Sequence, residues 1–365
     1  MPDDDPESSD AKLLNGEEGA VWSVHRAEGD RPDGTPAHRE RLHPDDLEAR
    51  RGGPDRGRSA KTPSDIPAPG WKDILLRVYR GISDARILAN AAAVTFYALL
   101  AVFPAVAALV SIYALFADPH SIEQHLNAVA GLLPGGAVDV IRSQLDRLIA
   151  QPQGTLGISF VIGLIVSLWS ANGGIKALFD ALNVVYEEKE QRGFVRLNAI
   201  TLAFTVAMLG FLIVALACLV ALPAALSMLP GFVAAVLSYA RWPLLLVLVG
   251  IALAFIFRYG PSRTEPQWRW LSWGSAFAAI GWLVASALFT WYAAKFGNFN
   301  KTYGSLGAVI GFMMWMWLSV IVILIGAKLN AEIEHQTAHD STEGPEKPLG
   351  RRRAKMADTV GEPPV

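Results

Sequence analysis

Cysteine is nearly absent from this chain, since only Cys218 occurs among its 365 residues. An intrachain disulfide and a cysteine metal cluster are therefore excluded. The sequence also lacks the start of a secretory signal, because it opens on the acidic stretch MPDDDPESSD instead of a basic region followed by a short apolar core. We expect no cleaved leader, so the first apolar segment has to direct insertion into a membrane.

Charge is scarce in the middle of the chain. Apolar residues make up 52% of the sequence although the first seventy residues and the last thirty are polar, so the apolar residues concentrate between them. Several central stretches of about 18 to 30 residues carry essentially no charge, which is typical of membrane-spanning helices. The sequence predicts an all-α polytopic membrane protein built as a six-transmembrane-helix bundle.

The predicted spans differ in length and in their flanking segments. They cover residues 87–116, 155–171, 199–222, 242–259, 270–292 and 304–327. The first would measure about 45 Å as one helix, too long to stand upright in a hydrocarbon core of about 30 Å, so we expect a helix bend at Pro104. Amphipathic stretches within 71–86 and 118–153 are predicted to form interfacial helices on the membrane surface.

Two polar tails flank the membrane domain, which is predicted to cover residues 71–336. Residues 1–70 and 337–365 are too poor in apolar side chains to offset the entropy of ordering, so both are predicted to be disordered. Lysine and arginine concentrate before span one, between spans two and three, between spans four and five, and after span six. By the positive-inside rule, both tails should be cytoplasmic.

Polar side chains share one side of the segment that follows the second span, and an apolar side opposes them. We expect this segment to continue the second span as a helix. The polar side is open to two interpretations. It is either a solvated face over an apolar floor or an inner polar cleft that receives a charged head group, with Lys176 and Asp180 as an i,i+4 pair. The residues of this candidate cleft are Asn172, Lys176, Asp180 and Asn183.

A second polar cluster, Asn298, Asn300 and Lys301, comes directly before the sixth span. It either caps that helix at the outer surface or lines an outer vestibule. Three glycines follow at the start of the same span. Because they share one helix face, they predict close packing against another helix. These glycines are Gly304, Gly307 and Gly311.

Ionisable residues are missing from the middle of every predicted span, where ion-coupled transporters place theirs. A proton-driven pump is therefore disfavoured. His335 and His339 are spaced i,i+4, but such a pair arises easily by chance and lies where the last helix ends. No phosphate-binding loop, nucleophile elbow or carboxylate pair occurs, so we predict no catalytic, cofactor or metal site.

Four stretches in the same order resemble the YihY/BrkB family of bacterial inner-membrane proteins, some members of which are named ribonuclease BN. The stretches are VTFYALLAVFPAVAALVSIYALF, LWSANGGIKALFDALNVVYEEKEQRGF, YGPSR and YGSLGAVIGFMMWMWLSVIVILIGAKLNAEIEHQT. The resemblance covers about residues 71–336 and implies a six-helix bundle in the inner membrane with both ends in the cytoplasm. It supplies no agreed catalytic residues. The ribonuclease name conflicts with the sequence, because the predicted cytoplasmic loops contain no histidine outside the two tails.

Two functions remain open from the sequence. The protein could move lipids or other amphiphiles through a groove between helices without ion coupling, or it could be a membrane scaffold for the cell envelope. The expected partners are membrane lipids, together with a second copy of the chain or envelope proteins, and no nucleic acid.

Overall fold

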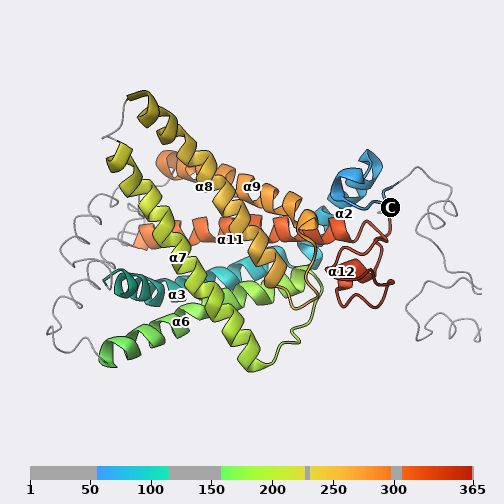
Figure 1. Ribbon diagram of the computed structural model, residues 1–365, viewed down its shortest axis with the longest axis horizontal. Coiled ribbons are helices and arrows are strands. Elements are labelled where there is room, and N and C mark those ends of the chain that lie inside the picture. Colours follow the sequence, from blue (N-terminus) through green and yellow to red (C-terminus); the bar gives the residue numbers. More distant parts are fainter. Residues whose placement is uncertain (1–55, 115–157, 227–230, 297–305, 364–365) are drawn as a thin grey trace, which may run out of the picture.

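The computed structural model describes residues 56–114, 158–226, 231–296 and 306–363. Helices make up most of these residues and no named strand occurs among them (Figure 1). The helices are η3 (Pro63–Asp65), α2 (Ala68–Asp84), α3 (Ile87–Ala114), α6 (Ile158–Val185), α7 (Phe194–Leu226), α8 (Gly231–Tyr259), α9 (Trp268–Phe296), α11 (Leu306–Glu334) and α12 (Lys355–Asp358). The predicted all-α polytopic membrane architecture is confirmed.

Five of these helices are long and apolar enough to cross a membrane. The candidate spans are Ile87–Val106, Val161–Val185, Phe194–Ala215, Trp268–Ala293 and Val309–Glu334. They match five of the six predicted spans. The fourth predicted span corresponds to α8, whose apolar part in the described residues, Pro243–Tyr259, is shorter. Six spans therefore stay a prediction.

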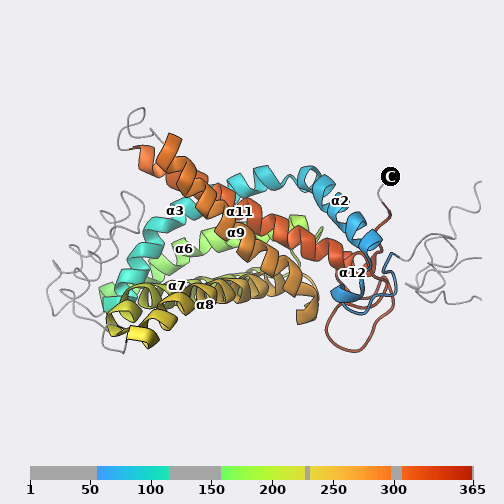
Figure 2. The ribbon, with the colours of Figure 1, turned by 90° about the horizontal axis from the view of Figure 1, so that it is seen from above.

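The long helices contact one another in a closed order. Helix α3 packs on α6 and α11, α11 on α9, α9 on α8, and α6 on α7, while α7 meets α8 more sparsely (Figures 1 and 2). The main apolar core takes most of its buried side chains from α3, α6, α8, α9 and α11, and Met356 of α12 joins it. Among the side chains of α7 that the structure describes, only the partly buried Phe204 and Met208 pack against this core. Of the described long helices, α7 is thus the most peripheral.

A close helix contact lies on α9 and α11, at glycines other than those expected from the sequence. A Cβ added to Gly326 would come within 2.7 Å of the Ala278 Cβ, and one added to Gly274 would collide with the Gly326 carbonyl oxygen. Small residues on both helices therefore let the backbones approach closely. A Cβ on Gly311 would instead meet nothing within 4 Å among the described atoms. Gly304 lies outside the described residues, and so does the packing around Gly307.

Pro104 lies inside α3, which remains one helix from Ile87 to Ala114. Figure 2 shows α3 curving between its two ends. The amphipathic helix α2 packs against α11 through a buried face that includes Ile74 and Val78, while Leu75 and Tyr79 are exposed. The second predicted amphipathic region, 118–153, lies outside the described residues.

Parts of both polar tails are ordered, contrary to the predicted disorder of residues 1–70 and 337–365. Residues 56–66 and 335–363 pack together at one end of the bundle, and we call them the cap. Polar groups join its two halves: Thr337 Oγ1 donates to the Ala60 carbonyl at 2.6 Å, and Gln336 Nε2 donates to the Arg56 carbonyl at 2.6 Å. Arg352 is buried and donates to the carbonyls of Ala338 and Ala357 at 2.7 and 2.6 Å. Hydrogen bonds from buried arginine thus add to the few apolar contacts of the cap, in which Ile66 and Met356 join the apolar clusters of the bundle.

Candidate functional site

Helix α11 carries charged side chains into the protein at the capped end of the bundle. Lys328, Glu332 and Glu334 lie in its last two turns and are all buried. Glu332 accepts from Arg77 Nε at 2.6 Å and pairs with Lys328 Nζ at 2.9 Å. Each buried acid therefore has a cationic partner, Glu334 through Arg263, as burial of charge requires.

The pair Arg263–Glu334 is the most enclosed of these contacts. The two side chains are 0% exposed and their charged atoms lie 2.7 Å apart. The guanidinium also stands over the ring of Tyr186, 4.6 Å from its centroid. Burial disfavours the charged form of Arg263, but the attraction of Glu334 outweighs it and raises the pKa of the guanidinium.

The loops beside α6 and α8 form a second polar network. Asn183 Oδ1 accepts the Ser262 amide hydrogen at 2.7 Å, and its Nδ2 donates to Glu190 at 3.1 Å. Glu190 pairs with Arg192 at 2.7 Å, and Arg192 also donates to the Gly260 carbonyl at 2.7 Å. Partial burial opposes ionisation of Glu190, but the hydrogen bonds from Arg192 and Asn183 outweigh it and lower its pKa to about 2. This network fixes the loop before α7.

A buried polar strip follows where α6 and α7 face each other. We call it the polar seam, and it comprises Asn172 of α6 with Asn198, Thr201 and Thr205 of α7. Thr205 Oγ1 lies 3.3 Å from Asn172 Oδ1, which joins the two helices. The three α7 residues fall on one helix face because they are spaced three and four apart.

The seam contains polar atoms that the described protein does not satisfy. Asn172 Nδ2 and Asn198 Oδ1 are buried and have no hydrogen-bond partner among the described residues. A buried polar atom left unpaired costs about 1–3 kcal/mol, so each of these atoms is expected to take a partner such as water or a ligand. Asn172 Nδ2 is a hydrogen-bond donor and Asn198 Oδ1 is an acceptor. A bound polar molecule could therefore accept a hydrogen bond at one position and donate one at the other.

The structure separates the residues of the predicted inner cleft. Asn172 and Asn183 are buried, as the cleft interpretation requires, but they belong to the seam and to the loop network respectively. Asp180 is exposed and forms no ion pair with Lys176 in the described structure. Lys176 is half-buried with its ammonium 5.2 Å from the Trp169 ring centroid. The predicted outer vestibule, Asn298, Asn300 and Lys301, lies outside the described residues.

Sequence reasoning missed the partners on α7 and in the loop after α8. Asn198, Thr201 and Thr205 sit in an apolar run, where Thr is easily assigned to bonds with its own helix backbone, and Thr201 and Thr205 do make such bonds. Their spacing on one face was the signal that could have identified them.

Comparison with known proteins adds the family. The family model described as Virulence factor BrkB matches residues 78–350. The chain belongs to the BrkB family. No solved structure matches it.

Relatives of this BrkB chain carry names of two kinds. It is 32% identical over 251 residues to the "Putative ribonuclease-like protein YfkH" of Bacillus subtilis, covering 66% of this chain and 88% of that protein. It is 24% identical over 277 residues to the "UPF0761 membrane protein Mpe_A1422" of Methylibium petroleiphilum, covering 74% of this chain and 64% of the relative. The "UPF0761 membrane protein NMB0524" of Neisseria meningitidis is 26% identical over 271 residues, covering 71% and 62% of the two chains. The chain thus spans less than two thirds of both UPF0761 proteins.

Proposed function

We propose that this BrkB family protein moves amphiphilic lipids across the bacterial inner membrane without ion coupling. The polar seam between α6 and α7 lies on the path of the head group. The unpaired buried atoms of Asn172 and Asn198 are the observation that carries the proposal. A head group rich in phosphate and hydroxyl oxygens would satisfy them, while its acyl chains stay in lipid beside the apolar outer faces of the helices.

Two further features support a path at this seam. Helix α7 is peripheral to the main core, so it can separate from α6 at a lower cost than the helices that share that core. Lys176 lies one turn from Asn172 toward the capped end, where its charge favours an anionic phosphate. The capped end would face the cytoplasm, as the lysine and arginine distribution predicts.

We propose transport without ion coupling because the buried charged side chains at the end of α11 are held in ion pairs. Within the described residues the buried Lys328, Glu332 and Glu334 all have ion-pair partners at the end of a span. Ion-coupled carriers place exchangeable charges nearer the membrane centre. We further propose that the chain is no ribonuclease, on the sequence argument above, and a nuclease assay on purified protein tests that part separately.

An isosteric pair of variants tests the role of the seam. Thr205→Val removes a seam hydroxyl, and Thr290→Val removes an exposed hydroxyl that bonds its own helix at Ser286 in the same way. In reconstituted vesicles we expect lipid movement to slow by about threefold to tenfold in Thr205→Val, the equivalent of one lost hydrogen bond of about 0.5–1.5 kcal/mol. The Thr290→Val protein should match the parent. Equal rates for all three would remove the seam from the path.

A scaffold is the second candidate, because the ordered cap offers a polar surface for docking another protein. If folded parent protein moves lipid no faster than empty vesicles, the scaffold is favoured.

A further inference from the structure

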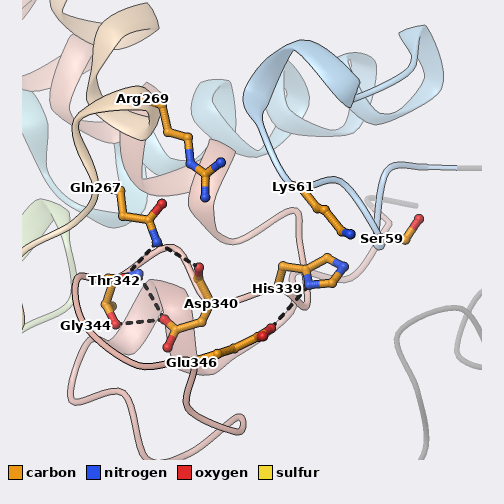
Figure 3. A pocket seen from close by; sticks show the side chains of 9 residues that line it. All are labelled: Ser59, Lys61, Gln267, Arg269, His339, Asp340, Thr342, Gly344 and Glu346. Carbon is orange, nitrogen blue, oxygen red and sulfur yellow. Dashed lines mark hydrogen bonds and ion pairs between the residues drawn. The ribbon is translucent and has the colours of Figure 1, made fainter.

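A polar groove opens beside the start of α9, on residues that the proposed lipid path does not use. Its volume is about 750 Å³. The lining residues come from the cap, from the α8–α9 loop and from the first turn of α9: Ser59, Lys61, Gln267, Arg269, His339, Asp340, Thr342, Gly344 and Glu346 (Figure 3). The groove is therefore built from chain segments far apart in sequence.

The acidic groups of the groove are already engaged. Asp340 accepts the Thr342 hydroxyl at 2.7 Å and the Lys347 amide hydrogen at 2.8 Å. Glu346 lies 3.5 Å from His339 Nδ1 (Figure 3). Gln267 donates through Nε2 to the Thr342 carbonyl at 2.9 Å. These contacts shape the groove. Arg352 Nε also lies 3.7 Å from Asp340, whereas the Glu346 side chain remains 73% exposed.

The two cationic side chains of the groove, in contrast, have no such partners among the described residues. Lys61 and Arg269 are exposed, and neither side chain has an ion pair or a hydrogen bond among the residues that the structure describes. Asp65 lies near Arg269, but its carboxylate accepts the Thr62 amide hydrogen at 2.8 Å instead. Arginines elsewhere at this end, such as Arg77 and Arg263, are bound to carboxylates. The groove thus offers two cationic side chains without a direct ion-pair partner among the described residues.

The position of the groove indicates that a bound anion would come from the membrane. Arg269 is the second residue of a candidate membrane span that begins at Trp268. Trp268 and Trp273 are 44% and 48% exposed, and the Trp71 ring lies 5.3 Å from that of Trp273. Exposed tryptophans at a span end mark the level of the lipid head groups. A phosphate at this level is covalently part of the membrane.

We propose that the groove binds the phosphate head group of an anionic phospholipid from the leaflet at the capped end, between Lys61 and Arg269. The site is separate from the polar seam. Its occupancy anchors the cap to the membrane surface, whether or not the protein moves lipid.

The test measures the affinity of the full-length protein in detergent for short-chain phosphatidylglycerol, with phosphatidylcholine of the same chain length as reference. The parent should prefer phosphatidylglycerol. The double variant Lys61→Gln/Arg269→Gln should lose about tenfold or more of that affinity, since each basic side chain near a lipid surface contributes roughly 1 kcal/mol. The matched control Lys72→Gln/Arg196→Gln removes two exposed charges outside the groove and should bind like the parent.

Three outcomes would overturn the proposal. An equal loss in the control would show diffuse surface attraction, and no preference for phosphatidylglycerol in the parent would show no anion site. Competition by dissolved glycerol phosphate as strong as that of the lipid would assign the groove to a free phosphate compound. Thermal melting of all variants checks folding, and the single variant Lys61→Gln replaces the double variant if that one melts lower. Because binding is the readout, the result is independent of lipid movement.

Discussion

At the scale of single residues, the enclosed pair Arg263–Glu334 makes a sharp prediction. Arg263→Met leaves a fully buried carboxylate without its partner and should destabilise the protein by about 3–5 kcal/mol. The double variant Arg263→Met/Glu334→Leu removes both charges and should melt at a higher temperature than Arg263→Met. Thermal unfolding in detergent measures both. A single variant that melts like the parent would show that the pair is not buried in the folded protein.

Glu190 predicts a dependence of stability on pH. Its folded pKa of about 2 lies below the ordinary value of 4.5. The network with Arg192 and Asn183 therefore stabilises the fold fully above pH 4.5, and this contribution is lost as the pH falls from 4.5 toward 2. We expect Glu190→Gln to melt lower than the parent at neutral pH, with the difference shrinking across that acidic window. A difference that stays constant with pH would contradict the role of the ionised carboxylate.

At the scale of helices, the close contact of α9 and α11 separates two kinds of glycine. Gly326→Leu should force the helices apart, because Ala278 and the α9 backbone occupy the space for its side chain, and overpacking of this kind costs about 1–3 kcal/mol. Gly311→Leu is the matched control and should be tolerated, since its Cβ would meet open space among the described atoms. Melting temperature and folded yield of the two variants decide the matter. A loss at Gly311 with none at Gly326 would reverse the assignment.

The sequence predicted the helices well and their contacts less well. Long runs of apolar residues specify a helix in a membrane by themselves, so α3, α6, α7, α9 and α11 fall close to the predicted spans. Which glycine meets another helix depends on crossing points that no single helix encodes, so Gly326 was missed. Composition misjudged parts of the tails, because Arg58 and Arg352 make buried hydrogen bonds to carbonyls there, and because Ile66 and Met356 reach the apolar clusters of the bundle.

The site was predictable to the same limited degree. The helical period identified Asn172 and Asn183 as polar residues on one side of α6. It could not show that Asn172 faces Thr205 of α7 while Asn183 binds the backbone of Ser262, because both contacts are made across the fold.

At the scale of the whole molecule, orientation is open to direct measurement. We expect both tails in the cytoplasm, from the lysine and arginine distribution. In a variant with Cys218 replaced, single cysteines at positions 125 and 300 should react with an impermeant thiol reagent in intact spheroplasts. A cysteine introduced by Lys347→Cys, at a partly exposed position of the cap, should not react. Protection of both outer positions, with labelling of the cap, would invert the topology.

Lipid movement by the whole protein can be measured in sealed vesicles without any ion gradient. Purified parent protein is reconstituted, and the rate at which labelled phospholipid in the inner leaflet becomes accessible from outside is compared with that of empty vesicles. We predict acceleration without a gradient and no further increase when a proton or sodium gradient is imposed. Correctly folded protein that leaves the rate at the level of empty vesicles, or that moves lipid only with a gradient, would contradict the account.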